Sequence, residues 1–199
     1  LDYIRYPQAL SSNYSNYDYS NWGYTKFARN EFEEMYGVDP IELRPYDALW
    51  NHWRAYRCNK VTNFVKKVSK LCRANNIELT AVFFPNRQSA LDTKLQDWKV
   101  WSINNFVDGF TPLFLTCDDK TATNLMEEVL RNKSSVTKLY AGLFVTFMNG
   151  SETDLLKQIH AARRYCLDGL ILFDYAHTGE KYTSVLTESV FKAYKKEPI

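Results

Sequence analysis

The chain has 199 residues, 45% of them hydrophobic and 24% charged, which is ordinary for one soluble globular domain with a substantial core. Acidic and basic residues are interspersed and the formal net charge is +2, which argues against nucleic acid or an anionic membrane surface as a partner. The longest apolar runs are strand-length, far short of the roughly 20 residues that span a bilayer.

The sequence predicts neither a metal site nor a cofactor. Its four cysteines form no CxxC pair and no Cys/His metal spacing, so we expect buried free thiols. There is also no nucleophile elbow and no Ser-His-Asp set.

Apolar runs and helical periodicity alternate along the chain. The first run starts without Met, in the middle of a strand-like pattern, and we expect an excised piece of a longer protein. The predicted strands are 1–6, 77–84, 107–115, 139–147 and 167–175. The predicted helices are 24–36, 47–75 with Asp47 as cap, 97–103, 121–132, 151–165 and 184–195. Long loops are expected at 7–22 and 85–93, with a connector at 38–45.

The order of these elements indicates an α/β fold with a parallel sheet. The strands are nearly continuously apolar, as in parallel sheets covered on both faces. Two strands share a lead-in, Val107-Asp108-Gly109-Phe110 and Leu167-Asp168-Gly169-Leu170, which fits a repeated βα unit. A doubly wound sheet fits the same order, but no Gly-rich phosphate loop follows any strand.

Short motifs follow one another in a fixed order over nearly the whole chain. They are Leu1-Asp2-Tyr3-Ile4-Arg5-Tyr6-Pro7, Tyr36-Gly37-Val38-Asp39-Pro40, Leu49-Trp50 with Trp53 and Arg57, Phe83-Phe84-Pro85, Asp97-Trp98, Val107-Asp108-Gly109 with Pro112, and Phe173-Asp174-Tyr175-Ala176. Together they resemble the glycosyl-hydrolase-like family 10 proteins of bacteria. The run Pro112-Leu113-Phe114-Leu115 departs from the family, which usually has a Met and a Tyr after this proline.

The resemblance implies a (β/α)₈ TIM barrel of which this chain is one domain, the C-terminal part with strands 4 to 8. Closing such a barrel needs eight strands. We therefore expect the N-terminal part of the same barrel, or an oligomer partner, to complete it. The resemblance also implies export to the cell envelope or the outside, and a complex or cell-envelope polysaccharide as substrate.

Glycoside hydrolysis commonly uses two carboxylic groups, which in a TIM barrel lie at the carboxyl ends of strands. Asp2 and Asp174 are the candidate catalytic carboxylates. The alternative roles are a salt bridge between Asp2 and Arg5, and a buried, hydrogen-bonded Asp174 that anchors the last loop. The candidate sugar-binding residues are Arg5, Tyr6, Trp22, Asn86, Tyr175 and His177.

Two features leave the activity open, and the first is the departure from the family at residues 112–115. Strand 77–84 has no glutamate at its carboxyl end, so a general acid would lie outside this chain or be lacking. The expected function is therefore a glycoside hydrolase-like barrel that acts through aspartates, with a non-catalytic glycan-binding barrel as the alternative.

Overall fold

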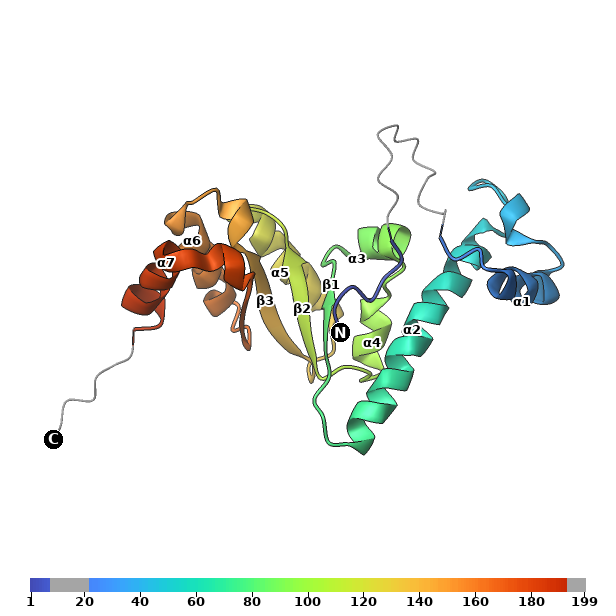
Figure 1. Cartoon of the computed structure of the whole chain (residues 1–199), viewed down its shortest axis with the longest axis horizontal. Coiled ribbons are helices and arrows are strands. Elements are labelled where there is room, and N and C mark those ends of the chain that lie inside the picture. Colours follow the sequence, from blue (N-terminus) through green and yellow to red (C-terminus); the bar gives the residue numbers. More distant parts are fainter. Residues whose placement is uncertain (8–21, 193–199) are drawn as a thin grey trace.

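A computed structural model describes residues 1–7 and 22–192 of the chain (Figure 1). Its strands are β1 Thr80–Phe83, β2 Gly109–Phe114, β3 Lys138–Phe144 and β4 Gly169–Phe173. Its helices are α1 Lys26–Tyr36, α2 Trp50–Ala74, α3 Arg87–Ser89, α4 Trp98–Ile103, α5 Asp119–Asn132, α6 Glu152–Arg164 and α7 Tyr175–Val185. Most of the predicted loop 7–22 and the end of the predicted helix 184–195 lie outside the described residues.

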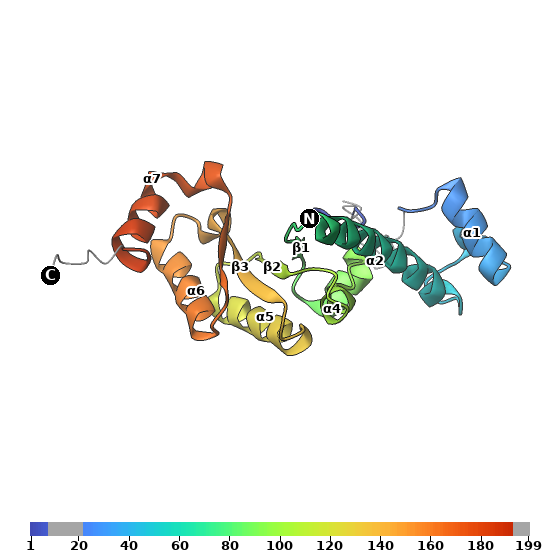
Figure 2. The same ribbon diagram turned by 90° about the horizontal axis from the view of Figure 1, so that it is seen from below.

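The strands form one parallel sheet in the order β1-β2-β3-β4. Figure 2 shows the helices following one another beside the strands, from α1 at one end of the molecule to α7 at the other. A doubly wound sheet reverses its strand order at a switch point, and the four described strands show no reversal. The predicted α/β class with a parallel sheet is confirmed.

The two faces of the sheet differ in what covers them. On one face, side chains of α2 and α4 pack on Phe83 and Phe110, and side chains of α5 and α6 pack on Phe114 and Leu143. Of the side chains that alternate with these and point to the opposite face, Thr111 is buried, but six apolar ones are partly buried or exposed. This second set, which we call the open face, consists of Val82, Leu113, Tyr140, Phe144, Ile171 and Phe173.

The repeated Asp-Gly lead-in has a structural purpose at the amino ends of the strands. Asp108 accepts a hydrogen bond from Leu79 N–H, and Asp168 accepts the equivalent bond from Leu139 N–H, each at 2.7 Å. Each aspartate thus fastens its strand to the start of the preceding one. The two glycines flank the Tyr140 ring, since a Cβ would meet that ring at 2.9 Å from Gly109 and 3.0 Å from Gly169.

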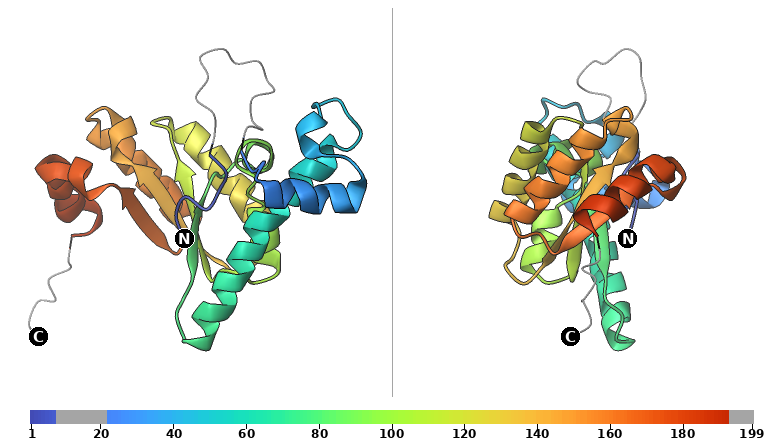
Figure 3. Two further views of the ribbon diagram at one scale, coloured as in Figure 1. Left: turned by 45° about the vertical axis from the view of Figure 1, so that its right-hand side comes forward. Right: turned by 90° about the vertical axis from the view of Figure 1, so that its left-hand side faces the viewer.

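Helix α1 and the start of α2 form a separate aromatic cluster. Figure 3 shows these two helices beyond the end of the sheet. Gly37 ends α1 with a φ of 73°, as the sequence predicts, whereas the helix begins two residues after its predicted start, with Thr25 as its cap. The Phe32 ring packs edge-on against Trp53 and Tyr56. This small core holds α1 on α2 without contributing to the sheet.

The predicted strand 1–6 is wrong. Leu1 alone pairs with β1, through Leu1 N to Thr80 O at 2.6 Å and Val82 N to Leu1 O at 2.8 Å. Tyr3 then takes a φ of 52°, which breaks the extended backbone. The segment lies along β1 but forms no further ladder with it.

Three other boundaries also differ from the prediction. Asp47 does not cap α2, because its side chain accepts a hydrogen bond from Arg44 N–H and closes a turn instead. A helical stretch, α3 continued to Lys94, occupies most of the predicted loop 85–93. The last helix begins at Tyr175, directly after β4, because Asp174 caps it.

No helix within residues 1–7 and 22–192 is long and apolar enough to cross a membrane.

Candidate functional site

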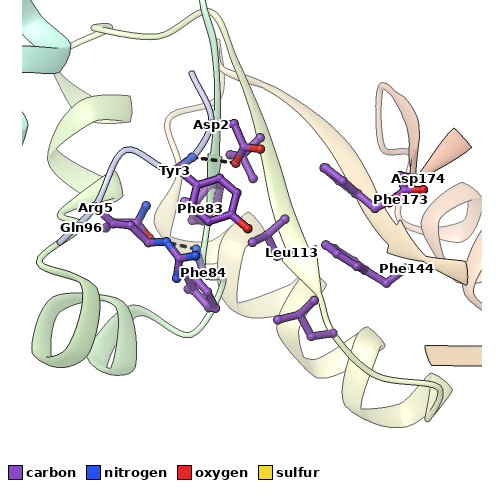
Figure 4. Close-up of a pocket in the computed structure, with 12 residues that line it drawn as sticks. Asp2, Tyr3, Arg5, Phe83, Phe84, Gln96, Leu113, Phe144, Phe173 and Asp174 are labelled. Atoms are coloured by element: carbon purple, nitrogen blue, oxygen red, sulfur yellow. Dashed lines mark hydrogen bonds between the residues drawn. The ribbon is translucent and has the colours of Figure 1, made fainter. Parts of the chain in front are cut away.

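A cavity of about 380 Å³ opens on the open face at the carboxyl ends of the strands (Figure 4). All four strands contribute to its wall, through residues at or just beyond their carboxyl ends, and the segment before β1 closes one side. The lining residues with charged or aromatic side chains that could bind or act on a ligand include Asp2, Arg5, Phe84, Phe144, Phe173 and Asp174. The carboxyl ends of parallel strands are where barrel enzymes place their active sites.

The two predicted catalytic carboxylates line this same cavity. Asp2 comes from the segment along β1 and Asp174 from the end of β4, so they approach the cavity from different parts of the chain. Asp2 is exposed and accepts a hydrogen bond from Tyr3 N–H at 2.7 Å. No ion pair joins Asp2 to Arg5 in the part of the chain that the structure describes, so the salt bridge considered for Asp2 is not formed.

Asp174 is held by the first turn of α7. Its carboxylate accepts hydrogen bonds from His177 N–H at 3.2 Å and from the His177 ring at 2.8 Å, measured to Nδ1. The bond from the His177 ring lowers the pKa of Asp174 below its ordinary value, and the backbone N–H groups of the turn add to the effect. The carboxylate is exposed rather than buried, which corrects the expectation of a buried anchor. The peptide bond that joins Phe173 to Asp174 is cis.

Arg5 forms the opposite wall with two aromatic rings. Its guanidinium carbon lies 4.7 Å from the centre of the Tyr3 ring and 4.9 Å from that of Phe84. The Phe84 ring also has Lys94 Nζ at 4.7 Å. Burial lowers the pKa of Lys94, and the nearby charge of Arg5 lowers it further. Arg5 and Lys94 thus place two basic side chains at the Phe84 ring, and Arg5 is the one that lines the cavity.

Gln96 fixes this wall in place. Its side-chain oxygen accepts a hydrogen bond from Phe84 N–H at 3.1 Å, and its amide donates to Ile4 C=O at 3.0 Å. The side chain is 1% exposed, so both bonds are shielded from water. Sequence reasoning missed Gln96 because nothing in a lone glutamine before a helix signals a contact with the first residues of the chain.

Two phenylalanines form the wall nearest β4. The rings of Phe144 and Phe173 stack with their centres 4.6 Å apart and their planes 8° from parallel. Paired positions of β3 and β4 bring them together. Phe144 could not be predicted as a site residue, because its only distinguishing feature in the sequence is its place near the end of an apolar run.

Five of the six predicted sugar-binding residues lie away from the cavity wall. Tyr6 packs beside Gly23 and the buried Arg57, and burial raises the pKa of its hydroxyl. Trp22 accepts a hydrogen bond from Arg57 through its carbonyl at 3.2 Å. Asn86 caps α3 and donates to Glu128 at 3.1 Å.

Tyr175 is 97% exposed and lines a separate shallow depression on α7. His177 is also outside the cavity wall and reaches it only through Asp174. Of the predicted binding residues, the structure thus places Arg5 alone in the cavity with the two aspartates.

Within residues 1–7 and 22–192, no three His, Cys, Asp or Glu side chains gather closely enough to hold a metal ion. Comparison of the chain with models of protein families, with curated proteins and with solved structures finds no match.

Proposed function

We propose that this chain is part of a TIM barrel that hydrolyses glycosidic bonds in a complex or cell-envelope polysaccharide. The observation that carries the proposal is the meeting of Asp2 and Asp174 in one cavity at the carboxyl ends of parallel strands. A pair of carboxylates across a cavity is the arrangement that glycoside hydrolysis commonly requires.

The arrangement of the sheet supports the barrel. Four parallel strands stand in sequence order, and the first residues of the chain lie along the edge of β1 that faces away from β2. The open face would be the interior of the barrel, completed by its N-terminal strands or by an oligomer partner. An exported bacterial protein is part of the same proposal and rests on the family resemblance of the sequence.

The two carboxylates have different chemical roles in this proposal. The hydrogen bonds that lower the pKa of Asp174 keep it ionised at neutral pH, which suits a nucleophile or a base and not a proton donor. Asp2 has fewer partners and faces the cavity from the other side. We assign Asp2 as the principal catalytic carboxylate and Asp174 as the second.

The test is release of sugar from polysaccharides and peptidoglycan fragments by the full-length protein. We expect Asp2→Asn to lower the rate by about 100-fold or more, because catalytic proton transfer or nucleophilic attack is lost. The matched control is Asp119→Asn, on the first turn of α5 and away from the cavity. An Asp2→Asn protein as active as the control would remove Asp2 from the mechanism.

A non-catalytic glycan-binding barrel is the second candidate. It is favoured by the hydrogen bonds that tie Asp174 to the first turn of α7, which give this carboxylate a structural role. Binding without turnover over the same panel of polysaccharides would support this candidate. Detectable hydrolysis of any of them would reject it.

A further inference from the structure

We propose that the cavity recognises a sugar that carries a carboxylate, and that Arg5 binds this carboxylate. The inference rests on the proposed carbohydrate function and narrows its substrate class to acidic glycans. It is argued from the Arg5 side of the cavity alone.

Two aromatic rings orient the Arg5 guanidinium. It lies between the rings of Tyr3 and Phe84, with distances to the ring centres of 4.7 and 4.9 Å. Over residues 1–7 and 22–192 it makes neither an ion pair nor a side-chain hydrogen bond. Ring contacts occupy the flat faces of a guanidinium and leave its N–H groups, which lie in the plane, for an acceptor.

The position of Arg5 is set by the fold. Gln96 joins the carbonyl of Ile4 to the backbone N–H of Phe84, and Tyr6 N–H donates to Lys94 C=O at 3.1 Å. These bonds hold the residues on both sides of Arg5. A guanidinium that is already oriented loses less conformational freedom when it binds a carboxylate.

The charge around Arg5 favours an anion over a neutral hydroxyl. Lys94 is buried and does not line the cavity, but its Nζ lies 4.7 Å from the centre of the same Phe84 ring, so a second cation stands behind this wall. Asp174 lies on the opposite side, at the end of β4 (Figure 4). A carboxylated sugar would therefore place its charged group at Arg5 and leave its glycosidic linkage towards the aspartates. The planar fork of Arg matches a carboxylate with two parallel hydrogen bonds, which Lys does not reproduce.

The experiment measures binding of tetrasaccharides from polygalacturonate, alginate and hyaluronan to the full-length protein by calorimetry. Each acidic tetrasaccharide is compared with its carboxyl-reduced form, in which a hydroxymethyl group replaces the carboxylate. The variants are Arg5→Gln and Arg5→Lys, with Arg164→Gln on the exposed side of α6 as the matched control.

We expect at least one acidic tetrasaccharide to bind about tenfold or more tightly than its reduced form, since a charge-assisted bidentate pair is lost on reduction. Arg5→Gln should abolish this difference, Arg5→Lys should recover only part of it, and Arg164→Gln should keep it. Circular dichroism of each variant checks that it is folded.

Reduced and acidic forms that bind equally, with no effect of Arg5→Gln, would overturn the carboxylate inference and leave the carbohydrate function standing. No binding of these tetrasaccharides, acidic or reduced, by a protein that does bind or cleave the polysaccharides or peptidoglycan fragments would overturn the inference alone. No binding or cleavage of any saccharide in either panel would overturn the carbohydrate function and the inference together.

Discussion

The two faces of the sheet contain similar apolar residues but have different surroundings. Phe110 on the helix-covered face is 0% exposed, whereas Ile171 on the open face is 38% exposed. Parallel sheets are normally covered on both faces. The covered face is therefore the stabilising core of this chain, and the open face, which ends at the cavity, is the side where we propose the function.

The largest expected effect is on the covered face. Phe110→Ala should lower the free energy of unfolding by about 3–5 kcal/mol, because it leaves a cavity beside Phe83 and Trp98. Denaturant unfolding measures it, with Phe27→Ala as control at a ring that is 73% exposed. Equal losses from the two substitutions would remove the distinction between core and surface.

An intermediate effect is expected on the open face. Ile171 is 38% exposed in the described chain, so we expect this face to drive self-association of the isolated chain. Ile171→Lys should shift sedimentation towards the monomer with a stability change of about 1 kcal/mol or less. Val136→Lys, at a site 71% exposed in a turn outside this face, is the control and should leave association unchanged. A wild-type chain that sediments as a single monomer with a cooperative melt would show that the open face needs no cover.

The smallest effect concerns the rim of the cavity. The folded-state pKa of Asp174 is lowered, so its contribution to stability is present above the ordinary value of 3.8 and is lost as pH falls through the folded pKa. Asp174→Asn should therefore melt slightly below the wild type at neutral pH, and the difference should shrink below about pH 4. Thermal melts between pH 3 and 7 measure this, and a difference that grows on acidification would contradict the assigned hydrogen bonds.

The helices with strong local signals could be predicted from sequence. Gly37 ends α1 and Ser151 begins α6 as predicted, because caps depend on residues a few positions apart. The strand 1–6 could not be rejected in this way, since its apolar pattern suits a strand. Whether it pairs depends on Gln96, whose side chain takes the place of a strand partner for Ile4.

The candidate site could be predicted in part from the sequence. Asp174 follows from the end of a predicted strand, and strand ends meet at one edge of a parallel sheet, whereas Asp2 follows from the family resemblance of the first residues. Asn86 stands at a strand end too, but its side chain caps α3 and turns to Glu128. A side chain that caps a helix is no longer directed at the cavity. Asn86 caps α3 because that helix follows it, and the sequence analysis predicted a loop there.

The most direct test of the account is to locate a bound saccharide on the two faces. Aromatic ring signals in NMR spectra of the full-length protein can be followed during titration with the acidic tetrasaccharides. We predict that Phe84, Phe144 and Phe173, which line the cavity, shift in a saturable manner, while the covered Phe110 and Trp98 do not. Saturable shifts confined to rings outside the cavity, with Phe84, Phe144 and Phe173 unchanged, would contradict the assignment of the open face as the functional side.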